Sequence, residues 1–264
     1  MSDDKKISIS IVVPVHNEEK RVEKGILRIC EYLENKKFQY EILVAEDGSV
    51  DNTVKIIEGL SRNNEKIKLI SSIKRLGKGR AISKAILYAK NDYVAYMDVD
   101  LAADPSELER LFKKINEYDI AIGSRLLRGD LSPIERPFYR TVTSFFYSKF
   151  FQLLFHNSIV DPQCGFKLFR KEIVFELFKD IKTIGFAFDS EVIIKALSLD
   201  LKIIEVPIIW SHEKASKLLV SEQIKKMGKE LLMIWYESHV LWLKGEKIYP
   251  QKKGSKSGML LFWI

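Results

Sequence analysis

The first 125 residues alternate between short runs of β-branched residues and longer segments whose hydrophobic residues recur at helical spacing. Residues 7–15 are a run of Ile, Val and Ser broken by a proline near its end, which is typical of a buried strand. Residues 18–36 then place Val22, Ile26 and Ile29 on one helical face. The same alternation continues along the chain. We expect further strands at residues 40–45, 67–71, 93–97 and 118–122, and further helices at 51–62, at 79–90 and from Asp104 onward.

Strand–helix alternation at this spacing predicts βαβ units, and therefore an α/β fold with a mostly parallel sheet flanked by helices. Ligands of such sheets bind at the carboxyl ends of the strands. Four polar clusters directly follow expected strands, so we expect their side chains to meet at one edge of the sheet. The clusters are residues 16–19 (His-Asn-Glu-Glu), 46–49 (Glu-Asp-Gly-Ser), 98–100 (Asp-Val-Asp) and 123–125 (Gly-Ser-Arg).

The pattern changes after residue 130, where two long helical segments are rich in aromatic residues. Residues 134–155 combine six Phe with Arg136, Arg140 and Lys149, and residues 218–243 combine two Trp and a Tyr with Lys225, Lys226 and Lys229. Either segment fits a core helix or an amphipathic helix that lies in a membrane interface. The sequence leaves both alternatives open.

Composition narrows the class of protein. The 264 residues suit one large domain or one domain with a modest appendage. A hydrophobic share of 46% with 30% charged residues excludes a disordered or collagen-like chain. Two cysteines exclude a disulfide framework and a Cys-rich zinc site. No run of about 18 apolar residues exists and no secretory pattern opens the chain, so we expect neither a transmembrane helix nor a leader.

The formal net charge of +7 is concentrated in the last quarter of the chain, where residues 201–264 hold eleven lysines against six glutamates, a balance of +5. Nucleic acid, phospholipid headgroups and a phosphorylated ligand are the anionic partners that suit such a segment, and a solvated basic face is the alternative. No nucleic-acid-binding motif is recognisable, which disfavours the first of these partners.

Three clusters carry candidate chemistry. Asp98 and Asp100 offer two carboxylates at a strand end, a donor set that suits Mg²⁺ or Mn²⁺ shared with substrate phosphates. Asp47 stands at another strand tip, free to accept a hydrogen bond from a ligand, whereas Asp51 suits a helix cap. Residues 77–80 (Gly-Lys-Gly-Arg) precede a helix and suit phosphate binding. A Walker A loop and a dinucleotide fingerprint are both lacking, which argues against an ATPase and a nicotinamide-dependent dehydrogenase.

Taken together, these motifs resemble family 2 glycosyltransferases. The resemblance covers about residues 7–220 and rests on five motifs in order, at 12–19, 46–53, 77–79, 97–101 and 123–125. Two downstream motifs, Asp-Pro-Gln-Cys-Gly-Phe-Lys-Leu-Phe at 161–169 and Gly-Phe-Ala-Phe-Asp-Ser-Glu at 185–191, resemble the polyprenyl-phosphate sugar synthases. The sequence of residues 163–169 is most similar to that of dolichyl-phosphate β-glucosyltransferases and, after these, to that of dolichyl-phosphate mannose synthases.

The resemblance implies a glycosyltransferase-A-type, Rossmann-like catalytic domain at residues 1–217, which includes an amphipathic acceptor or membrane-interface helix at 132–157, followed by a basic membrane-proximal tail at 218–264. It implies an inverting, metal-dependent transfer of a hexose, glucose from UDP-glucose, to dolichyl or polyprenyl phosphate. The alternatives are a GDP-mannose-dependent synthase and a transferase with a saccharide acceptor. It also implies a peripheral enzyme on the cytoplasmic face of an anionic membrane, with or without a membrane-embedded partner protein.

The resemblance further assigns roles to single residues. Lys217 and the arginines 125, 136 and 140 would face phosphates of donor or acceptor, and Asp161 joins the catalytic set. Mg²⁺ or Mn²⁺ would bind at Asp98 and Asp100. The wall that holds the nucleotide sugar would comprise Pro14, His16, Asn17, Glu18, Asp47, Lys78 and Asp98.

The acceptor determines what further chemistry is required. A lipid monophosphate is already ionised near neutral pH and needs no strong general base. A sugar hydroxyl needs one, and Asp161, Asp189 and Glu191 are the candidates, although a turn before a proline and the first turn of a helix explain them equally. A catalytically silent scaffold is disfavoured because Asp47, Asp98 and Asp100 are all present.

Overall fold

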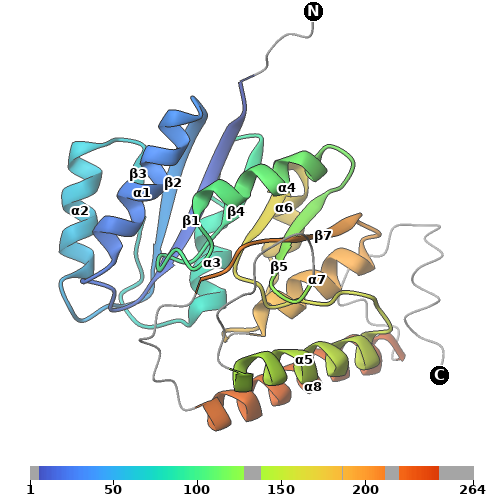
Figure 1. The fold of residues 1–264 in the computed structure, drawn as a ribbon. Helices are drawn as coiled ribbons and strands as arrows, with labels where there is room; N and C mark the ends of the chain where they lie inside the picture. The colour runs from blue at the N-terminus through green and yellow to red at the C-terminus, as the bar shows by residue number, and fades with distance from the viewer. Residues whose placement is uncertain (1–5, 128–137, 186, 212–219, 244–264) are drawn as a thin grey trace, which may run out of the picture.

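The computed structural model describes residues 6–127, 138–185, 187–211 and 220–243. Its centre is a seven-stranded sheet with the order β3-β2-β1-β4-β6-β5-β7 (Figure 1). The strands are β1 (Ser8–Val15), β2 (Gln39–Glu46), β3 (Ile67–Ile70), β4 (Tyr93–Tyr96), β5 (Ile120–Ser124), β6 (Lys167–Arg170) and β7 (Ile203–Pro207). The five strands expected from the sequence are confirmed, with β5 shifted toward the carboxyl end by two residues.

Helices connect these strands. They are α1 (Val22–Asn35), α2 (Thr53–Asn63), α3 (Lys78–Ile86), the 3₁₀ turn η1 (Pro105–Glu107), α4 (Leu108–Ile115), α5 (Phe138–Phe155), α6 (Lys171–Phe178), α7 (Phe188–Ser198) and α8 (Val220–Leu243). The helix expected from Asp104 onward begins with η1, where the Asp104 carboxylate accepts a hydrogen bond from the N–H of Ser106 (2.9 Å). The expected helix at 134–155 is described only from Phe138, and residues 132–137 of the expected interface helix lie outside the described residues.

The sheet is mostly parallel, as expected, with one antiparallel strand. β1 pairs in parallel with β2 and β4, β2 with β3, and β5 with β7. β6 runs antiparallel to both β4 and β5. The sequence pattern did not reveal β6, because both of its ends are basic and it lies beyond residue 130, where the regular strand–helix alternation stops.

The strand order reverses between β1 and β4, because β1, β2 and β3 proceed toward one edge of the sheet and β4 lies on the other side of β1. Such a reversal opens a crevice at the carboxyl ends of the two strands. α3 packs on β1 and β2, and α4 packs on β5, β6 and β7. The side chains of β1 and β2 are almost entirely buried, which gives the crevice a rigid floor.

α5 and α8 pack side by side at the bottom of the view in Figure 1, below α7. Phe151 and Phe155 of α5 and Leu231 and Ile234 of α8 are buried. Other apolar side chains of the two helices remain exposed. They are Phe145 (51%), Phe146 (66%), Leu153 (71%), Leu232 (48%), Met233 (54%) and Tyr236 (56%).

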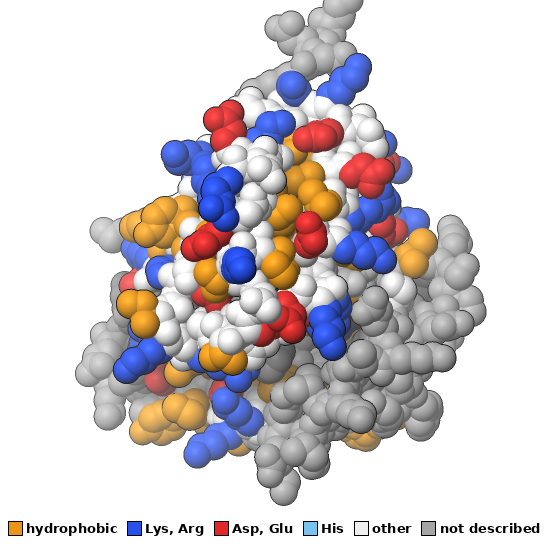
Figure 2. Space-filling model, turned by 90° about the vertical axis from the view of Figure 1, so that its left-hand side faces the viewer, with side chains coloured by type: hydrophobic (Ala, Val, Ile, Leu, Met, Phe, Trp, Pro, Cys, Tyr) orange, Lys and Arg blue, Asp and Glu red, His pale blue; other side chains and the backbone are white. Residues whose placement is uncertain are grey.

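None of the helices in the described part of the chain is both long and apolar enough to cross a membrane. On the face shown in Figure 2, basic and acidic side chains intermingle around smaller apolar areas.

Candidate functional site

Four chain segments converge on a cavity of about 230 Å³ at the reversal between β1 and β4. They are the end of β1, the end of β2, the start of α3 and the turn after β4. Residues from three of the four polar clusters, at 16–19, 46–49 and 98–100, therefore meet at the carboxyl edge, whereas the cluster at 123–125 is not part of the cavity lining. The cavity is lined by Pro14, Val15, His16, Glu18, Asp47, Arg75, Lys78, Ala81, Asp98, Val99 and Asp100.

Asp98 is held from two sides. The Lys78 ammonium donates to Asp98 Oδ1 at 2.6 Å. On the other side, a Cβ placed on Gly165 would lie only 2.5 Å from Asp98 Oδ2, so the backbone of the loop before β6 touches this carboxylate. Burial lowers the pKa of Lys78, but the negative charges of Asp98 and Asp189 outweigh that effect and raise it, so the ammonium stays charged.

Asp100 completes the carboxylate pair. One of its oxygens accepts a hydrogen bond from the N–H of Ala102 (3.1 Å). Burial, followed by the negative charge of Asp98, raises the pKa of Asp100. An uncompensated second carboxylate beside the first favours a cation at this point.

The donor set fits a divalent cation that is shared with a substrate. No group of three or more His, Cys, Asp or Glu within the described residues could hold a metal ion by itself. Two carboxylates at a strand end are what Mg²⁺ or Mn²⁺ uses when substrate phosphates and water complete the coordination. Asp98 and Asp100 are the residues that would hold such an ion.

Asp47 organises the loop that carries Lys78. Its Oδ1 accepts from the N–H groups of Leu76 (2.6 Å) and Gly77 (3.1 Å). Gly77 has φ of +96°, a conformation that favours glycine, and in this turn its N–H reaches Asp47. His16 Nδ1 lies 2.8 Å from the Asp47 carbonyl oxygen, which fixes the imidazole at the cavity wall.

The motif at 16–19 also braces the loop after β2. The Asn17 side-chain oxygen accepts from the N–H of Val50 (2.9 Å), and the N–H of Glu18 donates to Thr53 Oγ1 (2.8 Å). Glu18 lines the cavity, where burial raises its pKa despite its ion pair with Arg21. Asn17 is absent from the cavity lining and joins the two loops instead.

Arg125 and Asp161 form a buried ion pair. Arg125 Nε and Nη2 donate to the two Asp161 oxygens at 2.8 and 2.7 Å, and the Arg125 N–H donates to Asp161 as well. The guanidinium also lies 5.1 Å from the ring centroid of Trp210. The Glu205 carboxylate accepts from the N–H groups of Val160 and Asp161, which fixes the chain on the other side.

A second buried ion pair lies behind Asp98. Lys167 Nζ donates to the Asp189 carboxylate and to the carbonyls of Pro162 (3.0 Å) and Cys164 (2.7 Å). Tyr96 donates to the same Asp189 carboxylate. The network links β4, β6 and α7 and fixes the loop that presses Gly165 against Asp98.

The fold and this geometry agree with the comparisons. The sequence profile of glycosyl transferase family 2 matches residues 10–178, which is more than half of the chain. The chain belongs to glycosyl transferase family 2.

Curated relatives of this glycosyltransferase share about a third of its residues. The dolichyl-phosphate β-glucosyltransferase of Drosophila melanogaster is 32% identical over 89% of the chain and 76% of that protein. The human dolichyl-phosphate β-glucosyltransferase is 32% identical over 86% of the chain and 74% of that protein. Glycosyltransferase AglD of Haloferax volcanii is 32% identical over 88% of the chain, which spans only 37% of that longer protein.

Solved structures support the fold. The crystal structure of glucosyl-3-phosphoglycerate synthase from Mycobacterium tuberculosis, in complex with Mn²⁺, UDP-glucose and phosphoglyceric acid, superposes with a TM-score of 0.66. It covers 91% of this chain and 81% of the other at 16% identity. A mostly parallel, glycosyltransferase-A-type sheet is thus confirmed as the fold class.

The structure brings together most of the site residues expected in this glycosyltransferase. Pro14, His16, Glu18, Asp47, Lys78, Asp98 and Asp100 all line the cavity. Lys217, Arg136 and the side chain of Arg140 lie outside the described residues.

The sequence did not single out Arg75, Gly165 or Lys167. Arg75 lines the cavity, and Gly165 and Lys167 support Asp98 from behind. The signal available in the sequence was the Gly-Phe-Lys stretch at 165–167, within the motif at 161–169. The roles of its glycine and lysine become clear only once β6 is known to pair with β4.

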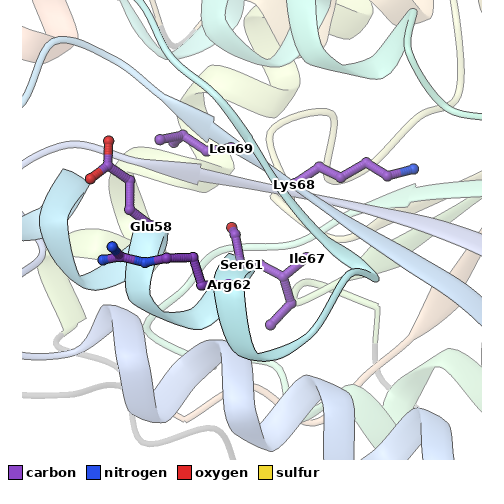
Figure 3. A pocket seen from close by; sticks show the side chains of 6 residues that line it. All are labelled: Glu58, Ser61, Arg62, Ile67, Lys68 and Leu69. Carbon is purple, nitrogen blue, oxygen red and sulfur yellow. The ribbon is translucent and has the colours of Figure 1, made fainter.

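The glycosyltransferase has another, wider depression of about 480 Å³ between α2 and the edge strand β3 (Figure 3). It shares no residue with the cavity at the carboxyl edge, and none of the sequence motifs reaches it. Its lining residues are Glu58, Ser61, Arg62, Ile67, Lys68 and Leu69.

Proposed function

We propose that this glycosyltransferase transfers glucose from UDP-glucose to dolichyl or polyprenyl phosphate with inversion at the anomeric carbon. The observation that carries the proposal is that all three candidate general bases already make structural contacts. They lie beside a cavity that suits a nucleoside diphosphate. The names of the relatives that match most of the chain support the same substrate class.

Each candidate base already has a structural role. Asp161 is paired with Arg125, and Asp189 with Lys167 and Tyr96. Glu191 accepts hydrogen bonds from the N–H groups of Lys182 (3.1 Å) and Thr183 (2.7 Å). A sugar hydroxyl acceptor would require one of these carboxylates to leave its partners, whereas an ionised lipid phosphate requires no base.

The donor would lie in the cavity with its nucleoside against Pro14, His16 and Asp47 and its diphosphate toward Lys78. A divalent cation at Asp98 and Asp100, Mg²⁺ or Mn²⁺, would neutralise charge on the departing diphosphate. A phosphate oxygen of the lipid then attacks the anomeric carbon, the glycosidic bond to the diphosphate breaks, and UDP leaves with the bonding electron pair. Lys78 and the neighbouring cationic side chains stabilise the charge that develops on that leaving group.

We assign Arg125 to positioning within this scheme. Its guanidinium is bound on one side by Asp161 and covered by Trp210. It therefore fixes the loop at Asp161 at the sheet edge, and acceptor phosphate binding is left to Arg136, Arg140 and Lys217.

The acceptor's hydrocarbon chain requires the enzyme to reach a membrane surface. The exposed apolar side chains of α5 and α8, with Lys149, Lys226 and Lys229 on the same helices, suit peripheral contact with an anionic membrane. We place this contact on the cytoplasmic face of the membrane, because both cysteines are free and buried and the cytosol keeps thiols reduced.

A donor and acceptor screen tests the proposal. The protein is incubated with labelled UDP-glucose or GDP-mannose, Mg²⁺ and either dolichyl phosphate or a saccharide. We expect an acid-labile, organic-soluble product from UDP-glucose and dolichyl phosphate. If GDP-mannose is consumed instead, the proposed donor sugar is wrong. If transfer occurs only to the saccharide, the proposed lipid-phosphate acceptor is wrong.

Asp100→Asn is the matched negative control for this screen. It removes one of the two carboxylates at the cation site, so turnover should fall at least about 100-fold while the fold is retained. Glu117→Gln changes an exposed carboxylate in the turn after α4, and it should leave turnover unchanged.

A further inference from the structure

Asp98 is one of the two carboxylates that would hold the divalent cation, and a lysine from a different element contacts it. Lys78 is the first residue of α3, and its ammonium reaches Asp98 Oδ1 at 2.6 Å across the cavity. Asp98 follows β4. The same carboxylate oxygen is thus shared between a cation supplied by the protein and the position where the divalent cation fits.

The backbone around Lys78 is fixed on both sides. The N–H of Gly77 donates to Asp47 (3.0 and 3.1 Å), and the N–H of Gly79 donates to the carbonyl of Ile184 (3.0 Å). A Cβ on Gly79 would lie 2.5 Å from the Cβ of Phe188, so the helix start is also closely packed. Only the side-chain torsions of Lys78 remain available for movement.

Charge repulsion prevents a divalent cation and the ammonium from sharing Asp98 at this distance. Two positive groups a few ångströms apart in a half-buried cavity repel each other strongly. In the absence of a diphosphate, Asp100 alone would offer at most two carboxylate oxygens, so a divalent cation bound to the free enzyme would also need Asp98. A divalent cation therefore has to displace the Lys78 ammonium, which then needs another anionic partner.

A nucleoside diphosphate supplies that partner. The cavity that Lys78 lines also contains His16, Asp47 and Arg75, so a diphosphate bound there lies within reach of the ammonium. Lysine binds phosphate as a point charge on a flexible stem, which suits such an exchange.

We propose that Lys78 is an exchangeable counter-ion, which neutralises Asp98 in the free enzyme and transfers to the donor diphosphate when the divalent cation binds. This inference rests on the proposed nucleotide donor. It follows that the cation and the nucleotide bind cooperatively, and linkage requires the coupling to be equal in both directions.

Calorimetric titration of the full chain tests the exchange. Mn²⁺ alone, UDP alone, and UDP at saturating Mn²⁺ are titrated into the wild type and into Lys78→Met and Lys78→Arg variants. In the wild type each ligand should tighten the other by about fivefold or more. Lys78→Met should bind Mn²⁺ alone more tightly and UDP alone more weakly, and should lose most of the coupling. Lys78→Arg should retain coupling, because it keeps the charge.

Lys84→Met is the matched control. Lys84 lies on the same helix, where its ammonium donates to the carbonyl of Ser71 (2.8 Å), and all three binding constants should match the wild type. Circular dichroism and thermal unfolding check that each variant is folded.

Two outcomes separate this inference from the proposed function. If Lys78→Met binds Mn²⁺ no more tightly than the wild type, or if the wild type binds Mn²⁺ and UDP independently while it still transfers glucose, the counter-ion exchange is wrong and the transfer reaction stands. If neither UDP nor GDP binds in the presence of Mn²⁺, the nucleotide donor itself is wrong.

Discussion

Gly165 lies where no other residue would fit without disturbing the carboxylate in front of it. Its Cα faces Asp98, and an added Cβ would come within 2.5 Å of Oδ2. Lys78 holds the other oxygen of the same carboxylate. The orientation of Asp98 is thus set by two contacts from opposite sides, the Lys78 ammonium and the backbone of Gly165, which comes close because it carries no side chain.

We predict that Gly165→Ala lowers kcat by about 10- to 100-fold, because the Asp98 carboxylate has to rotate or shift to admit the methyl group. Mn²⁺ affinity should fall in parallel, as measured by calorimetry. Gly59→Ala is the control: no heavy atom lies within 4 Å of its added Cβ in the middle of α2. It should keep full activity and gain about 0.5–1 kcal/mol of stability. Unchanged kcat in Gly165→Ala would show that Asp98 does not depend on this contact.

Single residues differ in how well the sequence reveals them. Asp47, Asp98 and Lys78 could be predicted because each lies at a strand end or helix start, where local spacing alone places it at the carboxyl edge. Gly165 and Lys167 could not be assigned, because their roles depend on the antiparallel pairing of β6 with β4. Arg125 was expected to face a phosphate, and its partners are Asp161 and Trp210.

At the scale of elements, Lys167 joins three segments that are far apart in the chain. Its ammonium, fully buried, binds Asp189 of α7 and the loop carbonyls of Pro162 and Cys164, and Tyr96 of β4 shares the same carboxylate. A buried ion pair of this kind is costly to break, because one charge is left without its partner.

We predict that Lys167→Met destabilises the protein by about 3–5 kcal/mol in urea denaturation, since Asp189 loses its counter-charge. Lys179→Met removes an exposed pair with Glu176 on α6 and should cost at most about 1 kcal/mol. The double variant Lys167→Met/Asp189→Asn should be less destabilised than the sum of its single changes, because both remove the same pair. Strict additivity would show that the two residues do not act as a pair.

The first three strands are joined by a second buried carboxylate. Glu41 of β2 accepts hydrogen bonds from Ser10 of β1 (2.7 Å), from Lys68 of β3 (2.6 Å) and from the N–H of Lys90 (2.8 Å). Burial raises the pKa of Glu41, but these hydrogen bonds outweigh it, so the pKa lies below its usual value. The folded state therefore favours the ionised form.

This lowered pKa predicts a stability that depends on pH. The contribution of Glu41 is fully present above the unfolded-state pKa of about 4.3 and is lost as the pH falls through the lower folded-state pKa. Glu41→Gln should cost about 1.5–3 kcal/mol at pH 7, and the difference from the wild type should shrink below about pH 4. Glu58→Gln, on the exposed surface of α2, should differ little from the wild type at any pH. A difference that stays constant down to pH 3 would contradict the assignment.

Elements within the regular strand–helix alternation could be predicted, and the strands outside it could not. β1 to β5 and the helices between them follow from patterns of buried residues over whole segments. β6 and β7 were missed, although β3 and β4 are just as short, because both lie beyond residue 130, where the strand–helix alternation stops. α5 is apolar on both its buried and its exposed side, so its pattern alone could not separate a core helix from an interface helix.

At the scale of the whole molecule, the carboxyl edge of the sheet, where the cavity lies, is close to the apolar helices α5 and α8. α5 packs against α8, and α8 is connected to the start of α3 through the segment at 184–187: the Gly79 N–H donates to the Ile184 carbonyl, and the Ala187 N–H donates to Glu230 of α8 (3.3 Å). Phe145, Phe146 and Leu153 of α5 are exposed there, with the Lys149 ammonium 5.7 Å from the ring centroid of Phe145. A surface of this composition suits the interface of an anionic bilayer. Under the proposed function, it would bring a lipid phosphate to the edge of the sheet where the donor would bind.

This arrangement predicts sedimentation of the protein with anionic liposomes and weaker binding at high salt, because the lysines contribute a screened attraction. Phe146→Glu/Leu153→Glu should abolish most of the binding, since it removes apolar area and adds negative charge. Turnover with a short-chain, water-soluble polyprenyl phosphate should stay close to that of the wild type. Phe175→Glu changes an equally exposed aromatic on α6 and should sediment as the wild type does. If the double variant binds as well as the wild type, α5 does not face the membrane, and the enzyme must reach its acceptor by another surface.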